Sequence, residues 1–177
     1  MEDSPTVRTM NLLIRPEQTR DHAAIAQVTR AAFAGNPYSQ QTEAFIIEAL
    51  RAAGALALSL VADHDGQVVG HVAFSHVDVS DGSGGWYGLG PISVFPPCQR
   101  SGIGSALIER GLADLRARQA AGCVLLGEPA YYGRFGFRQA RSLRLEGVPP
   151  EYFLVLPLAG EEPSGAVAYH PGFSATA

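Results

Sequence analysis

The sequence contains no lysine. All 13 of its basic residues are arginines, against 17 acidic residues, so the formal net charge is −4. Without an ε-amine the chain can build no Schiff-base enzyme, no lysine general base and no lysine-containing phosphate loop. A mildly acidic chain also has no general attraction to nucleic acid or to anionic lipid. We therefore expect no nucleic-acid partner and no membrane partner.

Cysteine and long apolar stretches are scarce as well. Cys98 and Cys123 are the only cysteines, which is too few for a disulfide framework and typical of a reducing compartment. The longest apolar stretch, around residues 55–62, is far shorter than the ~20 residues that cross a bilayer. Residues 1–10 are polar and lack the apolar core of a signal peptide. These features predict a cytoplasmic protein.

The overall composition is that of one folded domain. The chain has 177 residues, of which 46% are hydrophobic and 17% are charged, enough to bury one core and too apolar for a disordered chain. We expect a leader at residues 1–10, one domain at 11–160, and a C-terminal tail at 161–177 that packs on the domain.

The hydrophobic period alternates between that of helices and that of strands. Thr19 and Ser39 are candidate N-caps of the first two helices, and Asp65-Gly66 predicts a hairpin turn. Helices are predicted at 20–33, 39–53, 102–120 and 130–135, and strands at 12–15, 58–63, 67–79, 86–94, 123–126, 142–145, 152–156 and 167–169. This order predicts an α/β (α+β) fold, a mixed sheet with helices on its faces.

Residues 90–105 predict a strand, a tight turn and a helix start. Gly102 and Gly104 let successive backbone N–H groups point into one concavity with no side chain in the way. The helix start adds the positive end of its dipole, and Arg100 can add a full charge. The segment therefore predicts an anion site suited to a diphosphate.

Other interpretations of this turn are a known nucleotide motif or no ligand at all. A phosphate loop would need a lysine after the glycines, and a dinucleotide fold would need a third glycine where Leu107 stands. A nucleotide-binding module is therefore a distant alternative. An ordinary helix start that happens to contain glycine is the remaining one.

Two segments carry a family resemblance. Residues 99–104, Gln-Arg-Ser-Gly-Ile-Gly, match the Q/R-x-x-G-x-G/A pattern of the GCN5-related N-acetyltransferases (GNAT), and residues 92–96 match the strand before it. Residues 132–137, Tyr-Gly-Arg-Phe-Gly-Phe, resemble the Y-x-x-x-G-F segment of that family. The resemblance covers roughly residues 12–158, and the tail is similar to the bacterial YhbS-type branch. It implies a mixed, mostly antiparallel sheet, splayed at the acetyl-CoA site, with helices on both faces.

The resemblance implies that acetyl-CoA is the co-substrate and that the acetyl group moves directly to a primary amine in a ternary complex. The strand at 123–126 would splay from the strand at 86–94, and the thioester would sit in the opening. Gly90-Pro91 independently predicts a break in the strand ladder at this level. The implied cofactor-binding residues are Ile92, Ser93, Val94, Gln99, Arg100, Ser101, Gly102, Ile103, Gly104, Ser105 and Phe135.

Acyl transfer to an amine calls for a base and an acid. Deprotonating an alkyl ammonium of pKa ~10.4 at pH 7 costs about 4–5 kcal/mol, so a base is useful. Tyr132 is the predicted acid for the departing thiolate because it takes the tyrosine position of the motif, whereas Tyr131 would point about 100° away on a helix. Both tyrosines could instead simply pack in the core. The amide N–H at Val94 or at a neighbouring residue is the predicted oxyanion donor.

The base is less well defined. Glu128 is the first candidate, because Gly127 and Pro129 restrict its backbone. The alternatives are His76, Asp78 and Glu43, and each of these residues could equally be a solvated or structural one.

Several expectations complete this interpretation. No His, Cys, Asp or Glu cluster has metal-ligand spacing, so we expect no metal, and Cys98 is expected to be a bystander. The acceptor, a small-molecule or protein amine, is expected to meet residues 35–43, the loop at 80–85 and the tail. Exposed tail strands could pair in a homodimer. The alternative function is a non-catalytic acyl-CoA-binding or sensing module on the same fold.

Overall fold

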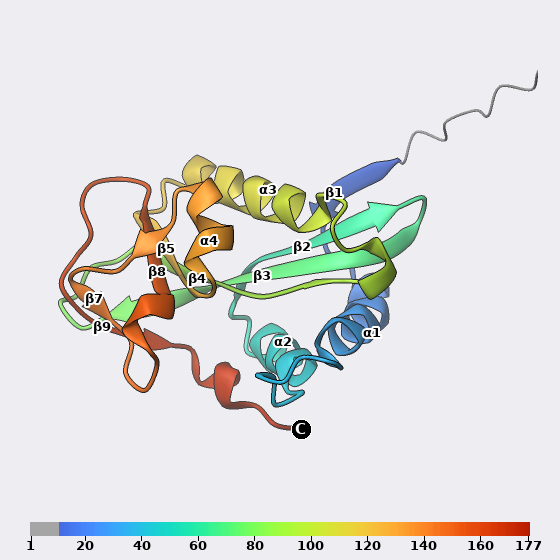
Figure 1. Cartoon of the computed structure of the whole chain (residues 1–177), viewed down its shortest axis with the longest axis horizontal. Coiled ribbons are helices and arrows are strands. Elements are labelled where there is room, and N and C mark those ends of the chain that lie inside the picture. The colour runs from blue at the N-terminus through green and yellow to red at the C-terminus, as the bar shows by residue number, and fades with distance from the viewer. Residues whose placement is uncertain (1–10) are drawn as a thin grey trace, which may run out of the picture.

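The computed structural model describes residues 11–177, so the predicted leader at 1–10 lies outside the described residues (Figure 1). The elements are β1 (Leu12–Pro16), α1 (His22–Phe33), α2 (Glu43–Ala52), β2 (Leu56–His64), β3 (Gln67–Val79), β4 (Trp86–Val94), α3 (Ile103–Ala117), β5 (Gly122–Leu126), α4 (Pro129–Tyr132), β6 (Arg138–Gln139), β7 (Leu143–Arg144), β8 (Phe153–Pro157) and β9 (Gly165–Tyr169). Short 3-10 helices occur at Thr19–Asp21, Pro96–Cys98, Gly133–Phe135, Pro150–Tyr152 and Pro171–Ser174.

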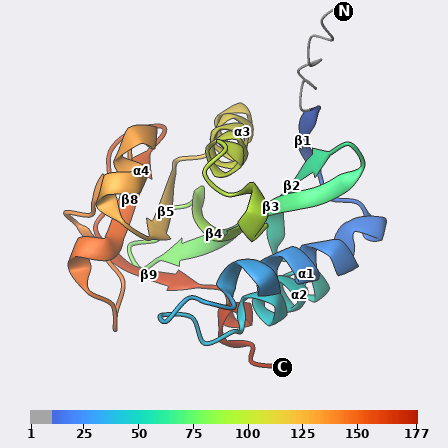
Figure 2. The same ribbon diagram turned by 45° about the vertical axis from the view of Figure 1, so that its right-hand side comes forward.

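The strands form one mixed sheet in the order β1-β2-β3-β4-β5-β8-β6, with β9 attached to β3 and β7 attached to β9. The pairing is antiparallel except between β4 and β5 and between β7 and β9. Helices α1 and α2 cover one face, and α3 and α4 lie on the other (Figures 1 and 2). The predicted α/β class and the splayed mixed sheet are confirmed.

Each face of the sheet has its own apolar contacts. On the α3 face, Phe74 packs with Leu107 in the largest buried cluster. Gly111 lets α3 sit directly on that ring, because a Cβ there would lie 2.3 Å from Phe74 Cε2. On the other face, Ile25 of α1 and Ile47 of α2 pack against Val61. Helix α3 is thereby held against the middle of the sheet, with its first turn beside β4.

The helix ends differ from those predicted. Thr19 does not cap the first helix, because a 3-10 turn begins after Gln18, whose N–H donates to Asp21 at 2.7 Å. The second helix begins at Glu43 rather than at Ser39, because Gln41 has a φ of 62°, which no helix accommodates. The third helix ends at Ala117, because Gln119 adopts a φ of 58°.

The carboxylate of Glu162 fastens the C-terminal segment to the loop before β7. It accepts hydrogen bonds from the backbone N–H groups of Arg141, Ser142 and Leu143 and from the Arg138 guanidinium, the last at 2.8 Å. Burial by itself raises the pKa of Glu162, but these four donors together lower it below its ordinary value. The side chain is only 5% exposed, so a buried carboxylate provides the negative charge to which the N–H groups of this loop bind.

Glu162→Gln is expected to lower the free energy of unfolding by about 2 kcal/mol, because three backbone donors and one guanidinium lose a charged acceptor. Urea unfolding at pH 7 measures the change. Glu161→Gln is the matched control, because Glu161 is exposed, and we expect it to change stability by less than about 0.5 kcal/mol. Equal effects of the two substitutions would contradict this role of Glu162.

No helix within residues 11–177 combines the length and the apolar character that crossing a membrane requires.

Candidate active site

Strands β4 and β5 separate after Gly88. They pair only from Trp86 to Gly88, against Gly122 to Val124. Just beyond this point the register between β3 and β4 shifts, so that Phe74 faces Leu89 but Val72 faces Ile92. The ladder break predicted from Gly90-Pro91 is confirmed. The result is a wedge-shaped opening between β4 and β5, which leaves one edge of β4 unpaired at Ile92 to Val94.

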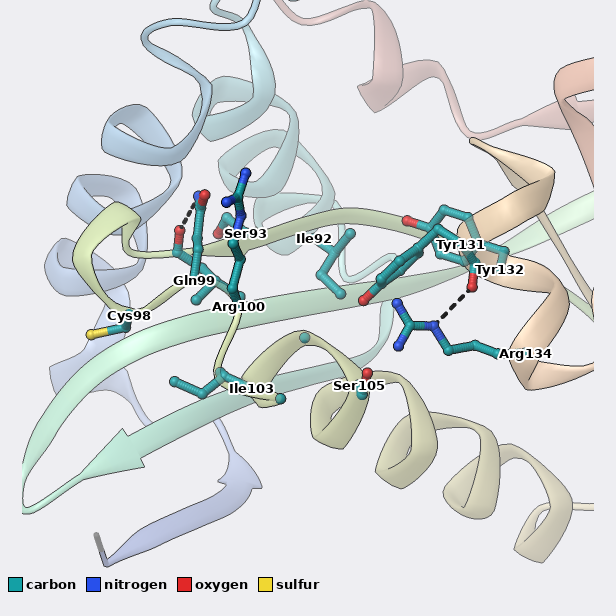
Figure 3. Close-up of a pocket in the computed structure, with 13 residues that line it drawn as sticks. Ile92, Ser93, Cys98, Gln99, Arg100, Ile103, Ser105, Tyr131, Tyr132 and Arg134 are labelled. Atoms are coloured by element: carbon teal, nitrogen blue, oxygen red, sulfur yellow. Dashed lines mark hydrogen bonds between the residues drawn. The ribbon is translucent and has the colours of Figure 1, made fainter.

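A cavity of about 590 Å³ lies beside this opening (Figure 3). It extends from the unpaired end of β4, past the turn that leads into α3, to the short helix α4. Its lining residues are Ile92, Ser93, Val94, Cys98, Gln99, Arg100, Gly102, Ile103, Gly104, Ser105, Tyr131, Tyr132 and Arg134.

The turn before α3 exposes backbone donors to the cavity. Arg100 and Gly102 both have left-handed backbones, with φ values of 62° and 87°. The Gln99 side chain donates to Val94 O at 3.0 Å and ties the turn to β4. The first intrahelical bond joins Ala106 N–H to Gly102 O, so the amides of residues 103–105 have no helical partner. Three N–H groups at a helix N-terminus form an anion-binding cradle.

Two tyrosines of α4 close the other side of the cavity. Their rings meet edge-on, with centroids 4.9 Å apart, and both reach from α4 toward the space between β4 and the start of α3 (Figure 3). A Cβ on Gly104 would lie 3.1 Å from Tyr131 Oη, and one on Gly127 would lie 2.3 Å from Tyr132 Cε2. The expectation that Tyr131 points away is wrong, because α4 is a single turn and both rings face the same cavity.

Burial changes the acidity of the Tyr132 phenol. Burial raises the pKa of Tyr132 to about 12, and the nearby Tyr131 adds to the effect. The hydroxyl is therefore fully protonated at neutral pH and acts as a hydrogen-bond donor. The ring of Tyr132 packs over Gly127, the residue that follows β5, at the edge of the opening.

The profile of the Acetyltransferase (GNAT) family matches residues 22–137 of the chain. This chain belongs to the GNAT family of acetyltransferases.

Similar proteins span nearly the whole GNAT chain. The uncharacterized N-acetyltransferase YhbS of Escherichia coli (strain K12) is 37% identical over 170 residues, which are 92% of this chain and 99% of that protein. A GNAT family acetyltransferase from Brucella melitensis, solved in complex with acetyl-CoA, is 51% identical with a TM-score of 0.84 and covers 93% of this chain and 99% of its own. Escherichia coli YhbS, solved in complex with CoA, has a TM-score of 0.85 and 35% identity, over 98% of this chain and 96% of its own.

Most residues expected to contact the cofactor in this GNAT chain line the cavity, but two do not. The Ser101 hydroxyl turns back and donates to Cys98 O at 2.5 Å. The Phe135 ring packs on Tyr131, with centroids 5.7 Å apart. Ser93 contributes to the lining, but its Oγ lies 3.3 Å from Thr29 Oγ1, so its side chain faces α1.

The cavity of this GNAT chain also contains an arginine that the sequence reasoning missed. Arg134 lies with its Cζ 4.3 Å from the Tyr131 ring centroid, and its Nε donates to Tyr131 O at 3.1 Å. It stands across the cavity from Arg100 (Figure 3), so cationic groups flank the donor cradle on two sides. Arg134 follows Tyr131 by three residues, and this spacing is the sequence feature that could have predicted their contact. Cys98 lines the cavity as a half-buried free thiol.

The base candidates lie outside the cavity lining. Glu128 is exposed and precedes α4, where its backbone carbonyl accepts from the N–H groups of both tyrosines. His76 and Asp78 are exposed on β3, level with the paired end of β4. The Glu43 carboxylate accepts a hydrogen bond from Ser39.

The loop at 80–85 lies at the paired end of β4, where Gly85 O accepts from Ala121 N–H at 2.8 Å. The opening is at the other end of β4, so the loop does not line it, and a contact between this loop and the acceptor stays a prediction. Within residues 11–177 no three His, Cys, Asp or Glu side chains gather as a metal site.

Proposed function

We propose that this protein transfers the acetyl group of acetyl-CoA to a primary amine. The observation that carries the proposal is one continuous cavity, with an anion cradle at the start of α3 and a strand opening at its other end. This arrangement suits a long molecule with phosphates at one end and a reactive thioester at the other. The acetyl-CoA and CoA named in the complexes of the two similar proteins support it.

The cofactor would lie along the cavity in two parts. The amide N–H groups of residues 103–105 would donate hydrogen bonds to the pyrophosphate, with Arg100 and Arg134 adding charge from either side. The unpaired backbone groups at Ile92 and Val94 would pair with the pantetheine amides, as an added strand would. The thioester would then reach the wedge where β5 leaves β4.

The transfer step forms a C–N bond and breaks a C–S bond. A neutral amine attacks the thioester carbonyl, the amide N–H at Val94 donates to the oxyanion, and the thiolate of CoA departs. The nitrogen loses one proton and the sulfur gains one, so the products are an N-acetyl amine and CoA. No acyl-cysteine is required, in keeping with the role of Cys98 as a lining residue only.

Tyr132 is the proposed acid for the departing sulfur. With the pKa of the phenol at about 12 and that of a free thiol at ~8.5, full proton transfer is uphill in water. Burial of the sulfur in the same opening raises the thiol pKa as well, so the difference between the phenol pKa and the thiol pKa becomes smaller. The phenol therefore first stabilises the developing thiolate by a hydrogen bond and then supplies the proton. Glu128 stays the proposed base, acting through water because it lies outside the cavity.

The proposal is tested by incubating the protein with acetyl-CoA and a panel of primary amines while measuring free CoA thiol and the acetylated product. We expect a turnover above about 1 s⁻¹ for at least one amine, with one acetyl amine formed for each CoA released. Tight binding of acetyl-CoA by calorimetry, without release of CoA for any amine, would instead establish a non-catalytic acyl-CoA-binding module.

A further inference from the structure

The sheet face opposite the cofactor cavity has an apolar wall at the opening. The cavity lies on the face covered by α3 and α4. Because direct transfer brings both substrates to one carbonyl carbon, the amine must reach the opening from the other face, where α1 and α2 lie. The residues on that face at the opening therefore contact the acceptor.

One half of this wall comes from the C-terminal segment. Tyr169 lies against Gly88, the last residue of β4 that pairs with β5, since a Cβ there would be 2.5 Å from Tyr169 Cε1. Its ring meets Phe173 edge-on, with centroids 4.9 Å apart. The same C-terminal segment contacts α2, because a Cβ on Gly172 would lie 3.0 Å from Leu50 Cδ2. The segment that holds this edge-on aromatic pair thus connects β4 with α2.

The other half comes from β5. Leu126 is the last residue of β5, and side chains alternate along a strand, so it shares a face with Val124. Val124 belongs to the same apolar cluster against which Tyr169 packs. Leu126 pairs with buried Phe153 yet is itself 47% exposed. Leu126 therefore lies two residues beyond Val124, the partner of Gly88, on the face where Tyr169 packs. An exposed leucine at this level of the opening is apolar surface that a ligand can cover.

We infer that the acceptor is an arylalkylamine, whose ring packs between Leu126 and the Tyr169–Phe173 pair while its amine enters the β4–β5 opening. This inference rests on the proposed function. Leu126 lies just beyond Gly88–Val124, the last pair that joins β4 to β5, so a ring held against it requires only a short alkyl link to a nitrogen in the opening. A polyamine would bring a second cation against the same apolar surface at a desolvation cost.

The test compares 2-phenylethylamine with ethylamine and putrescine at saturating acetyl-CoA. We expect kcat/KM for 2-phenylethylamine to exceed those for the other two amines at least tenfold, through burial of the ring. Leu126→Ser should remove most of this preference while leaving kcat/KM for ethylamine and the Kd for acetyl-CoA unchanged. Leu13→Ser is the matched control, because Leu13 is 57% exposed on the edge strand β1 and lies far from the opening, and it should retain the full preference.

A binding measurement separates this inference from the proposed function. Calorimetric titration of 2-phenylethylamine into the CoA-loaded protein should show binding that Leu126→Ser weakens at least fivefold, whether or not any amine turns over. Turnover of putrescine in preference to 2-phenylethylamine, or an equal loss with all three amines in Leu126→Ser, would overturn the inference. Absence of 2-phenylethylamine binding to the CoA-loaded protein would overturn it too.

Discussion

Tyr132→Phe is expected to lower kcat for acetyl transfer about a hundredfold, while the Kd for acetyl-CoA changes by less than twofold. The substitution removes only the hydroxyl, and the ring still packs over Gly127 at the end of β5. Loss of a positioned general acid typically costs 10²–10⁴-fold. The measurements are steady-state release of CoA thiol and calorimetric binding of acetyl-CoA. The KM for the amine should stay unchanged, because the hydroxyl acts on the leaving group.

Tyr131→Phe is the matched control for this prediction. Tyr131 lines the same cavity, but its hydroxyl lies against the start of α3, near Gly104. We expect its loss to change kcat by less than threefold and to weaken acetyl-CoA binding modestly. If Tyr131→Phe abolished turnover and Tyr132→Phe did not, the acid would be the other phenol. Full activity of both variants would exclude a phenolic acid altogether.

The second large effect is on stability at acid pH and comes from His71. This residue is fully buried on β3, its Nε2 lies 2.8 Å from Ser59 Oγ, and within residues 11–177 its Nδ1 has no partner. Burial lowers the pKa of His71 from 6.5 to about 4, with Glu17 partly opposing the shift and Arg51 adding to it. The folded protein therefore holds this imidazole neutral under conditions where the unfolded chain protonates it.

The direction of the pH dependence of stability follows from the difference in His71 pKa between the folded and unfolded states. Above pH 6.5 both states hold a neutral His71, and the residue contributes no pH dependence. Between pH 6.5 and about pH 4 the unfolded state binds a proton that the folded state does not, so stability falls as pH falls. The total loss is about 3 kcal/mol, at ~1.36 kcal/mol for each pKa unit. Below pH 4 the contribution levels off.

Urea unfolding of the wild type and of histidine variants at a series of pH values measures this loss of stability. His71→Gln should have a flatter profile than the wild type between pH 6.5 and 4, whereas His22→Gln should keep the wild-type profile because the His22 side chain is 37% exposed. If His71→Gln does not fold, NMR titration of the His71 ring in the wild type provides the same answer. A ring that titrates near pH 6.5 would contradict the prediction.

Local patterns were enough to predict much of the fold. Asp65-Gly66 was predicted as the turn between two strands, and β2 and β3 meet there, with His64 opposite Gln67. Gly102 was predicted to shape a turn, and it has the left-handed backbone that glycine adopts at low cost. Both features depend on the backbone preferences of one or two residues, which a sequence displays directly.

Long-range pairing was not available from such patterns. Strand β6 has two residues and is defined by its pairing with β8. The pairing of Val77 with Tyr169 joins segments far apart in the chain. Its consequence, a tyrosine over Gly88 at the opening, follows only once β9 is placed in the sheet. The loop at 80–85 was assigned to the acceptor site because nothing local indicates which end of β4 opens.

The sequence by itself determined the chemistry of the phosphate-facing turn. With no lysine in the chain, an anion there must be bound by backbone N–H groups and arginine, and the glycines that expose those amides are visible in the sequence. Only the tertiary structure decided which side chains surround the rest of the cavity. Tyr131 comes from α4 and Arg134 from the 3-10 turn that follows it, whereas Leu126 and Tyr169 come from β5 and β9. The relative positions of these elements depend on packing across the whole sheet. Backbone conformation at a turn is a local property, whereas the lining of a cavity is set by contacts between elements distant in the chain.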